Sequence, residues 1–226
     1  MFLRLIQDGL HDGHWNMRVD EMIFLSHIQN QNPFPTLRFY RFREPVQTVG
    51  YGLWRSRHRL PLANDSLIRR LTGGGLVQHG ADLTYSVVSP IRLQPWLRRP
   101  RESYHLIHLA LRNALVTFGI AAELWRGKCP TGDGRICFDS PVHDDVILNG
   151  KKIAGAAQKR SRGYLLHQGS IAWPSLATGD HGFSEKLFRL EFARGLGSLF
   201  DLPVKEIPFV TEDTWESRVS LLQPSA

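Results

Sequence analysis

The sequence predicts an α+β domain in which a mixed or antiparallel central sheet is flanked by helices. Three observations support this class. Strand-like runs gather in the middle of the chain, helical runs lie on either side of them, and neither a repeat nor a low-complexity linker divides the 226 residues. A chain of this length can bury a sizeable core. One domain over residues 1–226 is therefore the simplest organisation.

The composition is that of a soluble globular protein. Hydrophobic residues make up 42% of the chain and charged residues 22%, unlike a disordered chain. No apolar run reaches the roughly 18 to 20 residues that span a bilayer. Arg4 and Asp8 interrupt the apolar N-terminus, which argues against a signal peptide. We therefore expect a cytoplasmic protein.

The charge balance is basic. Lysine and arginine outnumber aspartate and glutamate by 28 to 21, a formal net charge of +7. Such a balance favours acidic partners, whether nucleic acid, phosphorylated ligands or an acidic protein. The basic residues are mostly scattered along the chain, so a solvated basic surface and a specific docking face both remain open.

The first strand is expected over residues 2–6, followed by a helix. Asn16 is a residue type that caps helices, and apolar residues between it and Asn30 supply one face. Asp20 and Glu21 would then lie near the helix N-terminus, where negative charge complements the helix dipole. Two prolines follow and end the helix.

Runs rich in β-forming residues predict the next strands, at residues 36–42, 48–52 and 83–88. A helix over residues 100–118 follows, with Gly119 placed to stop it. His105 and His108 lie three apart in this helix. No third metal ligand is nearby, so we interpret them as exposed or hydrogen-bonded histidines rather than a metal pair.

The strongest local signal lies in the second half of the chain. Asn149 and Gly150 stand between two short apolar runs and form the residue pair of a type I′ hairpin. Residues 163–173 are interpreted as a further pair of strands. Ser184 is placed to cap a last amphipathic helix.

The most distinctive stretch is residues 69–80, where two arginines precede three consecutive glycines. Glycines in a row suit a backbone that approaches something closely or adopts positive φ. Neither the dinucleotide fingerprint nor the P-loop spacing is present. A common nucleotide site is therefore disfavoured, while a ligand-binding loop and a plain tight turn both remain open.

Two candidate reactive groups follow the glycine stretch. Two cysteines are too few for a disulfide framework or a structural zinc site. Cys137 lies close in sequence to cationic residues that can lower a thiol pKa, so it is either a nucleophile or a buried inert thiol. Alternation along a hairpin strand sends Lys151 and Lys152 to opposite faces. An inward lysine can polarise a carbonyl or pair with a carboxylate; the alternative is two surface lysines.

Taken together, these segments resemble the lipoate–protein ligases and octanoyltransferases, which share a catalytic fold with biotin protein ligase. The resemblance runs from about residue 16 to residue 173 in the family's order. It is carried by RLTGGGLV at residues 70–77 with His79-Gly80, by NGKKIAGAAQ at residues 149–158, and by LHQGSI at residues 166–171.

The resemblance implies roles for the residues in these segments. Lys152 would bind the reactive carbonyl or carboxylate end of a medium-chain acyl group, and no metal site is implied. The candidates for deprotonating an acceptor lysine are His79 and His167. The acyl-binding residues implied are Arg70, Thr72, Gly73, Gly74, Gly75, His79, Gly155, Ala156, His167 and Gly169.

The segment CFDSP at residues 137–141 resembles the cysteine motif of one branch of octanoyltransferases. It implies that Cys137 takes octanoate from acyl carrier protein as a thioester, with no cofactor required. The acceptor would be a lysine in a lipoyl domain of a 2-oxoacid dehydrogenase or in the glycine-cleavage H protein. A basic enzyme suits the acidic carrier, and the tail after Trp173 looks too short for a C-terminal accessory domain.

Two alternatives stay open. The segment after Pro141 departs from the aromatic–acidic pair expected in cysteine transferases, and Asp145 before an apolar strand looks more like an ATP- and Mg-dependent lipoate–protein ligase. A non-catalytic acyl-binding relative is the third possibility, although the intact Cys137 and Lys152 argue against it. Neither nucleic acid nor a membrane is expected as a partner.

Overall fold

The computed structural model describes residues 1–55, 67–127, 140–173, 176 and 184–208. Within these residues, eight strands form one large sheet: β1 (Leu3–His11), β2 (Thr36–Phe42), β6 (Leu83–Pro90), β7 (Glu123–Leu124), β8 (Val146–Leu148), β9 (Lys151–Ser161), β10 (Tyr164–Ile171) and β11 (Val204–Glu206). Their order is β11-β1-β2-β6-β10-β9-β8-β7. β1 is parallel to β2 and β11, and the remaining neighbours are antiparallel. The sheet is therefore mixed, as predicted.

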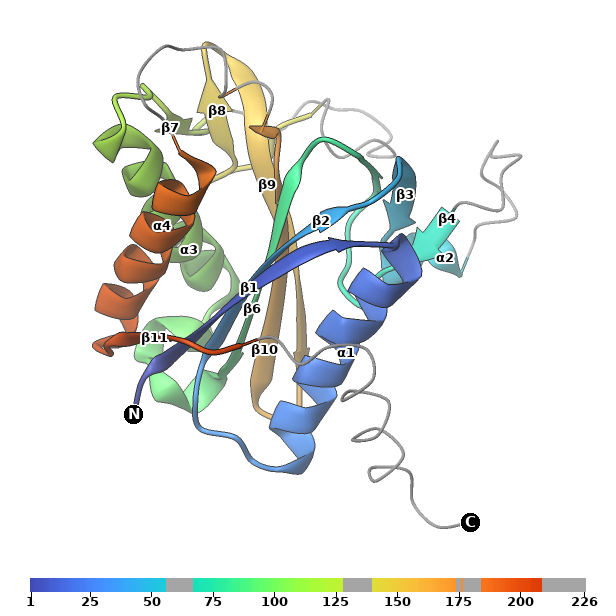
Figure 1. Ribbon diagram of the computed structural model, residues 1–226, viewed down its shortest axis with the longest axis vertical. Helices are drawn as coiled ribbons and strands as arrows, with labels where there is room; N and C mark the ends of the chain where they lie inside the picture. Colours follow the sequence, from blue (N-terminus) through green and yellow to red (C-terminus); the bar gives the residue numbers. More distant parts are fainter. Residues whose placement is uncertain (56–66, 128–139, 174–175, 177–183, 209–226) are drawn as a thin grey trace.

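Helices cover both faces of this sheet (Figure 1). α3 (Pro100–Thr117) and α4 (Glu185–Phe200) lie on one face, and α1 (Gly13–Gln29) lies on the other. The larger hydrophobic core lies between the sheet and the α3–α4 pair, and a smaller one lies under α1. This arrangement confirms the predicted α+β class, because each amphipathic helix buries its apolar side on a face of the sheet.

A second sheet of three strands holds the glycine-rich stretch. Its strands are β3 (Val46–Val49), β4 (Leu67–Arg69) and β5 (Leu76–His79), in the order β4-β3-β5. The three glycines lie in the connection from β4 to β5. This sheet packs against the first turn of α1, where a Cβ on Gly13 would come within 2.3 Å of Ile68. The glycine connection is thereby held near the N-terminus of α1.

The start of α1 differs from the prediction. Asp12, not Asn16, caps the helix, and its side chain accepts a hydrogen bond from the Trp15 N–H at 2.9 Å. Asn16 is fully buried inside the helix and bonds to other elements. Asp20 does not complement the dipole either, because it is fully buried and forms an ion pair with Arg38 at 2.8 Å. Asn16 and Asp20, which the local pattern assigned to the helix start, are therefore bonded to residues of other elements instead.

Two further segments differ from their predicted form. The strand predicted at residues 48–52 ends at Val49, and the next residues form the short helix α2 (Tyr51–Trp54). Residues 163–173 contain the single strand β10 and not a pair of strands. Residues 164–171 run continuously, pairing with β9 on one side and with β6 on the other. β11 was not predicted.

Other local predictions are confirmed. Asn149 and Gly150 have φ values of 50° and 75°, as a type I′ turn requires, and join β8 to β9. Gly119 follows Phe118, the C-cap of α3, and has a φ of 76°. Ser184 stands at the N-cap position of α4, although its side chain makes no capping hydrogen bond.

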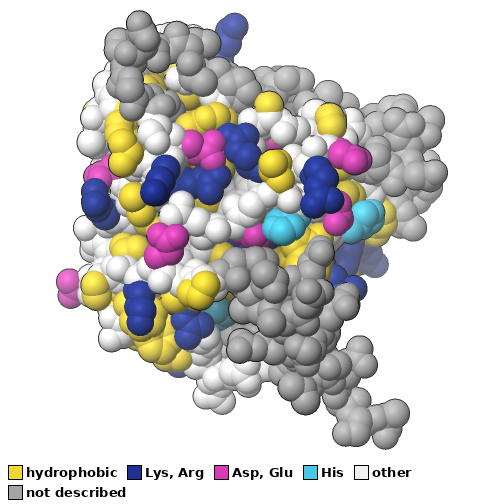
Figure 2. Space-filling model, in the orientation of Figure 1, with side chains coloured by type: hydrophobic (Ala, Val, Ile, Leu, Met, Phe, Trp, Pro, Cys, Tyr) yellow, Lys and Arg dark blue, Asp and Glu magenta, His cyan; other side chains and the backbone are white. Residues whose placement is uncertain are grey.

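The distribution of charged side chains on the surface concerns two alternatives, a solvated basic surface and a specific docking face. On the face in Figure 2, lysine and arginine side chains are interspersed with aspartate and glutamate rather than gathered in one patch. None of the described helices is long and apolar enough to cross a membrane.

Candidate active site

Lys152 and Asp145 form a buried ion pair at the edge of the large sheet, where β8 begins. The distance from Nζ to Oδ2 is 2.8 Å, and the side chains are 6% and 0% exposed. The same carboxylate accepts hydrogen bonds from the Val142 N–H at 2.7 Å and from the Tyr104 hydroxyl at 2.5 Å. Lys151 is exposed, so the two lysines point apart as predicted.

Gly155 makes room for this ion pair. A Cβ on Gly155 would lie 2.5 Å from Cε and 2.8 Å from Nζ of Lys152, and 3.2 Å from Oδ1 of Asp145. Contacts shorter than 3.0 Å are not tolerated without movement. The absence of a side chain at Gly155 therefore sets the space in which the lysine lies.

The glycine connection is fixed by the Arg70 side chain. Its guanidinium donates to the carbonyl oxygens of Gly73 at 2.8 Å and Gly75 at 2.7 Å, and to both the carbonyl and the hydroxyl of Thr48 at 3.1 Å. A planar group with five donors suits such a set of diverging acceptors. Arg70 thus shapes the loop from beneath, where the side chain is buried.

Gly50 and Gly74 explain why this loop is rich in glycine. A Cβ on Gly50 would lie 2.2 Å from the Gly74 carbonyl oxygen, so the two backbone segments touch. Gly74 itself has a φ of 86°, which favours glycine. A Cβ on Gly73, in contrast, would have no heavy atom of the described residues within 4 Å. The loop therefore packs tightly on one side, and no described residue covers the other side of Gly73.

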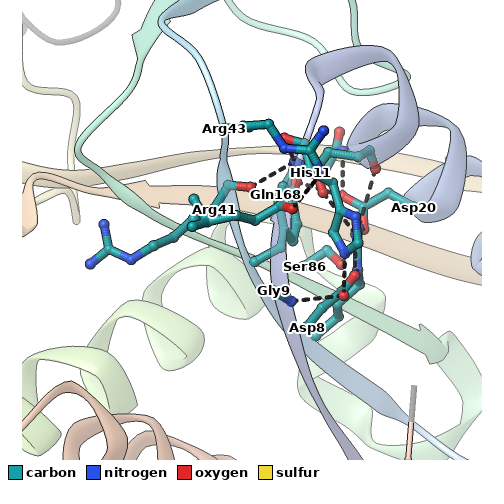
Figure 3. Close-up of polar contacts among 12 residues, drawn as sticks. Asp8, Gly9, His11, Asp20, Arg41, Arg43, Ser86 and Gln168 are labelled. Atoms are coloured by element: carbon teal, nitrogen blue, oxygen red, sulfur yellow. Dashed lines mark hydrogen bonds and ion pairs between the residues drawn. The ribbon is translucent and has the colours of Figure 1, made fainter. Parts of the chain in front are cut away.

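Thr72 ties the loop to the large sheet. Its hydroxyl donates to the Gln168 side-chain oxygen at 2.8 Å, and the Gln168 amide donates to Asp20 at 2.8 Å. Asp20 also accepts from Ser86 and from the buried Arg38. Figure 3 shows Gln168, Ser86 and Asp20 converging between the sheet and α1. The orientation of Thr72 is thus set by a chain of polar contacts that reaches the first helix.

The loop and the Lys152 slot lie on the same face of the sheet. Gly155 pairs across the ladder with Ser170, and Gln168 lies two residues before Ser170 on β10. Residues two apart on a strand share a face. Gly155, which makes room for Lys152, and Gln168, which binds Thr72, therefore lie on the same face of neighbouring strands.

His79 has a structural place beneath the loop. Its Nδ1 lies 2.7 Å from Asp82 and its Nε2 lies 2.8 Å from the Thr48 hydroxyl. Burial alone would raise the pKa of Asp82, but hydrogen bonds from His79, Ser170 and the Gly80 N–H lower that pKa to about 2. Both ring nitrogens of His79 lie within hydrogen-bonding distance of described residues, Nδ1 of Asp82 and Nε2 of Thr48.

His167 lies on the opposite face of the sheet from the glycine loop. It stacks on Tyr85 and contacts His108 and Tyr104, and its ring nitrogens lie 3.2 Å from the Tyr85 hydroxyl and the Gln158 amide. Burial, then the nearby His108 and Arg160, lower its pKa well below the usual value. His167 is thus separated by the sheet from Thr72 and the loop. Because its pKa is lowered, the His167 ring is neutral.

Ala156 and Gly169 face one another across the ladder, on the same face as His167. A Cβ on Gly169 would lie 2.3 Å from the Tyr85 ring, so this glycine makes room for the ring. The acyl-binding roles of Ala156 and Gly169 remain predictions.

The two helical histidines are hydrogen-bonded, as predicted. His105 Nδ1 lies 2.9 Å from Asp144, and His108 Nδ1 lies 2.6 Å from the Asp144 carbonyl oxygen. No cluster of metal-ligating side chains occurs among the described residues. Cys137 and Cys129 lie outside the described residues.

Sequence reasoning assigned no role in the site to four residues that shape it: Tyr104, Asp82, Gln168 and Asp20. Each has at least one partner far away in sequence: Tyr104 binds Asp145, 41 positions later, and Asp82 binds Ser170, 88 positions later. Asp145 was noted only as a ligase-like feature, and its position directly before an apolar strand was the one local signal available. A single sequence contains no pattern that pairs such distant polar groups.

Comparison with known proteins decides the family. The model of the lipoyl protein ligase A/B catalytic domain matches residues 12–179, most of the chain. The chain belongs to this family. The match contains the glycine loop, Cys137 and Lys152, and it confirms the resemblance found in the sequence.

Two curated relatives of this lipoyl ligase A/B domain are octanoyltransferases LipM. The protein from Kyrpidia tusciae is 35% identical over 181 residues, which is 74% of this chain and 65% of the relative. That from Oceanobacillus iheyensis is 34% identical over 171 residues, 74% of this chain and 62% of the relative. The chain therefore spans somewhat less than two-thirds of the length of these relatives.

Solved structures share the fold of this lipoyl ligase A/B domain. A lipoate-protein ligase A bound with ATP matches with a TM-score of 0.68 and 21% identity, over 98% of this chain and 94% of that one. The bipartite lipoate protein ligase of Thermoplasma acidophilum, studied with its E2 lipoyl domain, matches with a TM-score of 0.59 and 20% identity, over 97% and 91%. The predicted ligase-type catalytic fold is confirmed.

Proposed function

We propose that this chain is an octanoyltransferase of protein lipoylation. It would move an octanoyl group from acyl carrier protein, through a thioester on Cys137, to a lysine of a lipoyl-domain protein. The observation that carries the proposal is the similarity to LipM octanoyltransferases at 35% and 34% identity. The family region, residues 12–179, contains both Cys137 and Lys152.

The first chemical step is thioester exchange. The Cys137 thiolate attacks the carbonyl carbon of the octanoyl thioester, the bond to the carrier sulfur breaks, and the carrier leaves as a thiol after taking a proton. Exchange between two thioesters has little thermodynamic cost. Lys152 is the cation proposed to stabilise the negative oxygen that develops on the carbonyl.

The second step transfers the group to the acceptor. The neutral amine of the acceptor lysine attacks the Cys137 thioester, an amide forms, the amine loses a proton, and the Cys137 thiolate is regenerated. Neither His79 nor His167 is favoured as the group that takes this proton, because all four ring nitrogens are engaged with described residues.

The glycine loop is proposed as a wall for the acyl chain. Arg70 and Thr72 hold the loop from the sheet side, and no described residue covers the other side of Gly73. An apolar chain needs a channel with polar groups only at its head. The Lys152–Asp145 pair, on the same face as the loop, would supply that head.

The macromolecular partners are also part of the proposal. A net charge of +7 suits an acidic carrier as the acyl donor. A lipoyl domain suits the acceptor role, since a similar ligase of Thermoplasma acidophilum has an E2 lipoyl domain as its partner.

An ATP-dependent lipoate–protein ligase is the second candidate. A protein of similar fold binds ATP, and Asp145 before an apolar strand favours this reading. In a ligase, Cys137 would have no chemical role, and ATP with Mg²⁺ would activate a free carboxylate. The two candidates therefore differ in their dependence on one thiol.

Intact mass spectrometry after incubation with octanoyl acyl carrier protein tests the proposal. We expect a hydroxylamine-sensitive octanoyl adduct that is lost in Cys137→Ala and retained in Cys129→Ala, the matched control. Pyrophosphate exchange into ATP that depends on lipoate and survives Cys137→Ala would instead establish the ligase. Binding of octanoate with neither reaction would favour a non-catalytic relative.

A further inference from the structure

Tyr104 connects helix α3 to the Lys152–Asp145 pair. Its hydroxyl oxygen lies 2.5 Å from Oδ1 of Asp145 and accepts a hydrogen bond from the Ala156 N–H at 3.1 Å. Ala156 lies on β9 beyond Ala154, the last residue that pairs with β8. The phenol thus binds the edge of β9 just beyond the last described pair between β8 and β9.

The direction of these hydrogen bonds is fixed. The Ala156 N–H can only donate, so the hydroxyl hydrogen of Tyr104 is directed to the Asp145 carboxylate. Burial, then the negative charge of Asp145, raise the pKa of Tyr104 well above its usual value. The phenol therefore stays protonated and remains a donor throughout the working pH range.

The carboxylate of Asp145 is held from α3, from β9 and from the segment before β8 that contains Val142. Tyr104 on α3 binds Oδ1, while the Val142 N–H and Lys152 on β9 bind Oδ2. A lysine side chain has a flexible four-carbon stem, so its ammonium is placed only as well as its partner is. With both oxygens occupied, Asp145 acts as an anchor and not as a free base.

We infer that Tyr104 is a positioning residue for Lys152, acting through Asp145. The inference rests on the proposed function, in which the Lys152 ammonium stabilises the developing oxyanion. Tyr104 and Val142 keep the carboxylate in place, and Gly155 leaves a single space for the lysine. Loss of the phenol hydroxyl leaves the carboxylate free to turn, so the ammonium is misplaced at the moment that charge develops.

The test compares Tyr104→Phe with Tyr85→Phe. Tyr85 is a matched control because its buried phenol lies in the same ring cluster, yet its hydroxyl bonds to His167 and not to Asp145. Transfer from octanoyl acyl carrier protein to a lipoyl domain is followed at saturating and limiting donor. We expect kcat to fall about tenfold or more in Tyr104→Phe, as for loss of a hydrogen bond to a charged group, with KM within about twofold. Tyr85→Phe should retain the wild-type kcat.

A double-mutant cycle separates positioning from general loosening of the fold. If Tyr104 acts through Asp145, then Tyr104→Phe should lower kcat much less in an Asp145→Asn background than in the wild type. If Tyr104→Phe only loosened the fold, it would lower kcat by the same factor in both backgrounds. Thermal unfolding is recorded for each variant, and kinetics at 10 °C replace those at 25 °C for any variant that is partly unfolded.

Each outcome has a defined meaning. A selective, non-additive loss of kcat supports the inference. Wild-type kcat in Tyr104→Phe, or equal losses in both backgrounds, overturns the inference while leaving the proposed function intact. A wild-type protein that forms no acyl adduct and transfers no octanoate overturns the proposed function, and the inference falls with it.

Discussion

The Lys152 ammonium lies 2.8 Å from the Asp145 carboxylate, in a pair whose side chains are almost completely buried. Burying two charges has a large desolvation cost, which is offset only while both are present and well bonded. Both charges are present here and the carboxylate is hydrogen-bonded, so removing one partner should destabilise the fold.

Replacing Lys152 with methionine leaves the Asp145 charge buried without its cation. We expect acyl transfer to fall by about 10²- to 10³-fold, since a group that stabilises the oxyanion is lost. The free energy of unfolding should fall by about 3–5 kcal/mol. Single-turnover transfer and urea unfolding measure the two effects. The exposed neighbour serves as control, and Lys151→Met should change neither; undiminished transfer in Lys152→Met would exclude the role.

Replacing Gly155 with alanine should displace the Lys152 side chain. The added methyl group would lie 2.5 Å from Cε of the lysine, so the ammonium must move while the strand persists. We expect transfer to fall by about tenfold or more, because misplacement of a reacting group by about 1 Å has a large effect on rate. The control is Gly9→Ala, where a Cβ meets no atom within 4 Å. Equal activity of the two variants would show that the space at Gly155 is not needed to place the Lys152 side chain.

Replacing Arg70 with lysine should loosen the glycine loop. Lysine keeps the charge but cannot reach Gly73, Gly75 and Thr48 together. We expect KM for the octanoyl donor to rise and the free energy of unfolding to fall by about 1–3 kcal/mol, as buried carbonyls lose their donors. Arg69→Lys is the control, since Arg69 is partly exposed and its partner Glu21 is 3.9 Å away. A KM that shifts equally in both variants would count against a specific role for Arg70.

The depressed pKa of Asp82 predicts how stability depends on pH. The folded-state pKa is about 2, against an ordinary aspartate pKa of 3.8. The carboxylate therefore contributes stability above about pH 4, and this contribution is lost as pH falls toward 2. Its size is about 2 kcal/mol. Urea unfolding at pH 5, 3.5 and 2 should show a difference between wild type and Asp82→Asn that shrinks as pH falls. A constant difference would refute the linkage.

Much of the fold could be predicted because its signals are local. The Asn149–Gly150 turn, the helix ending at Gly119 and the strand at residues 36–42 are each specified by residues close together in the chain. The predicted cap at Asn16 and the position of Asp20 were wrong, because contacts with Arg38 outweigh a local preference worth about 1 kcal/mol.

The sequence by itself determined the α+β class, the glycine-rich loop, the opposite faces of Lys151 and Lys152, and the family. These follow from periodicity, turn chemistry and motif spacing, all of which act over short stretches. Only the tertiary structure decided that Asp145 and Tyr104 fix the lysine, and that His167 lies on the opposite face from the loop. The physical reason is that two polar groups become partners in a buried site only when their strands and helices pack together. That packing is a property of the whole sheet, and no short stretch of sequence contains it.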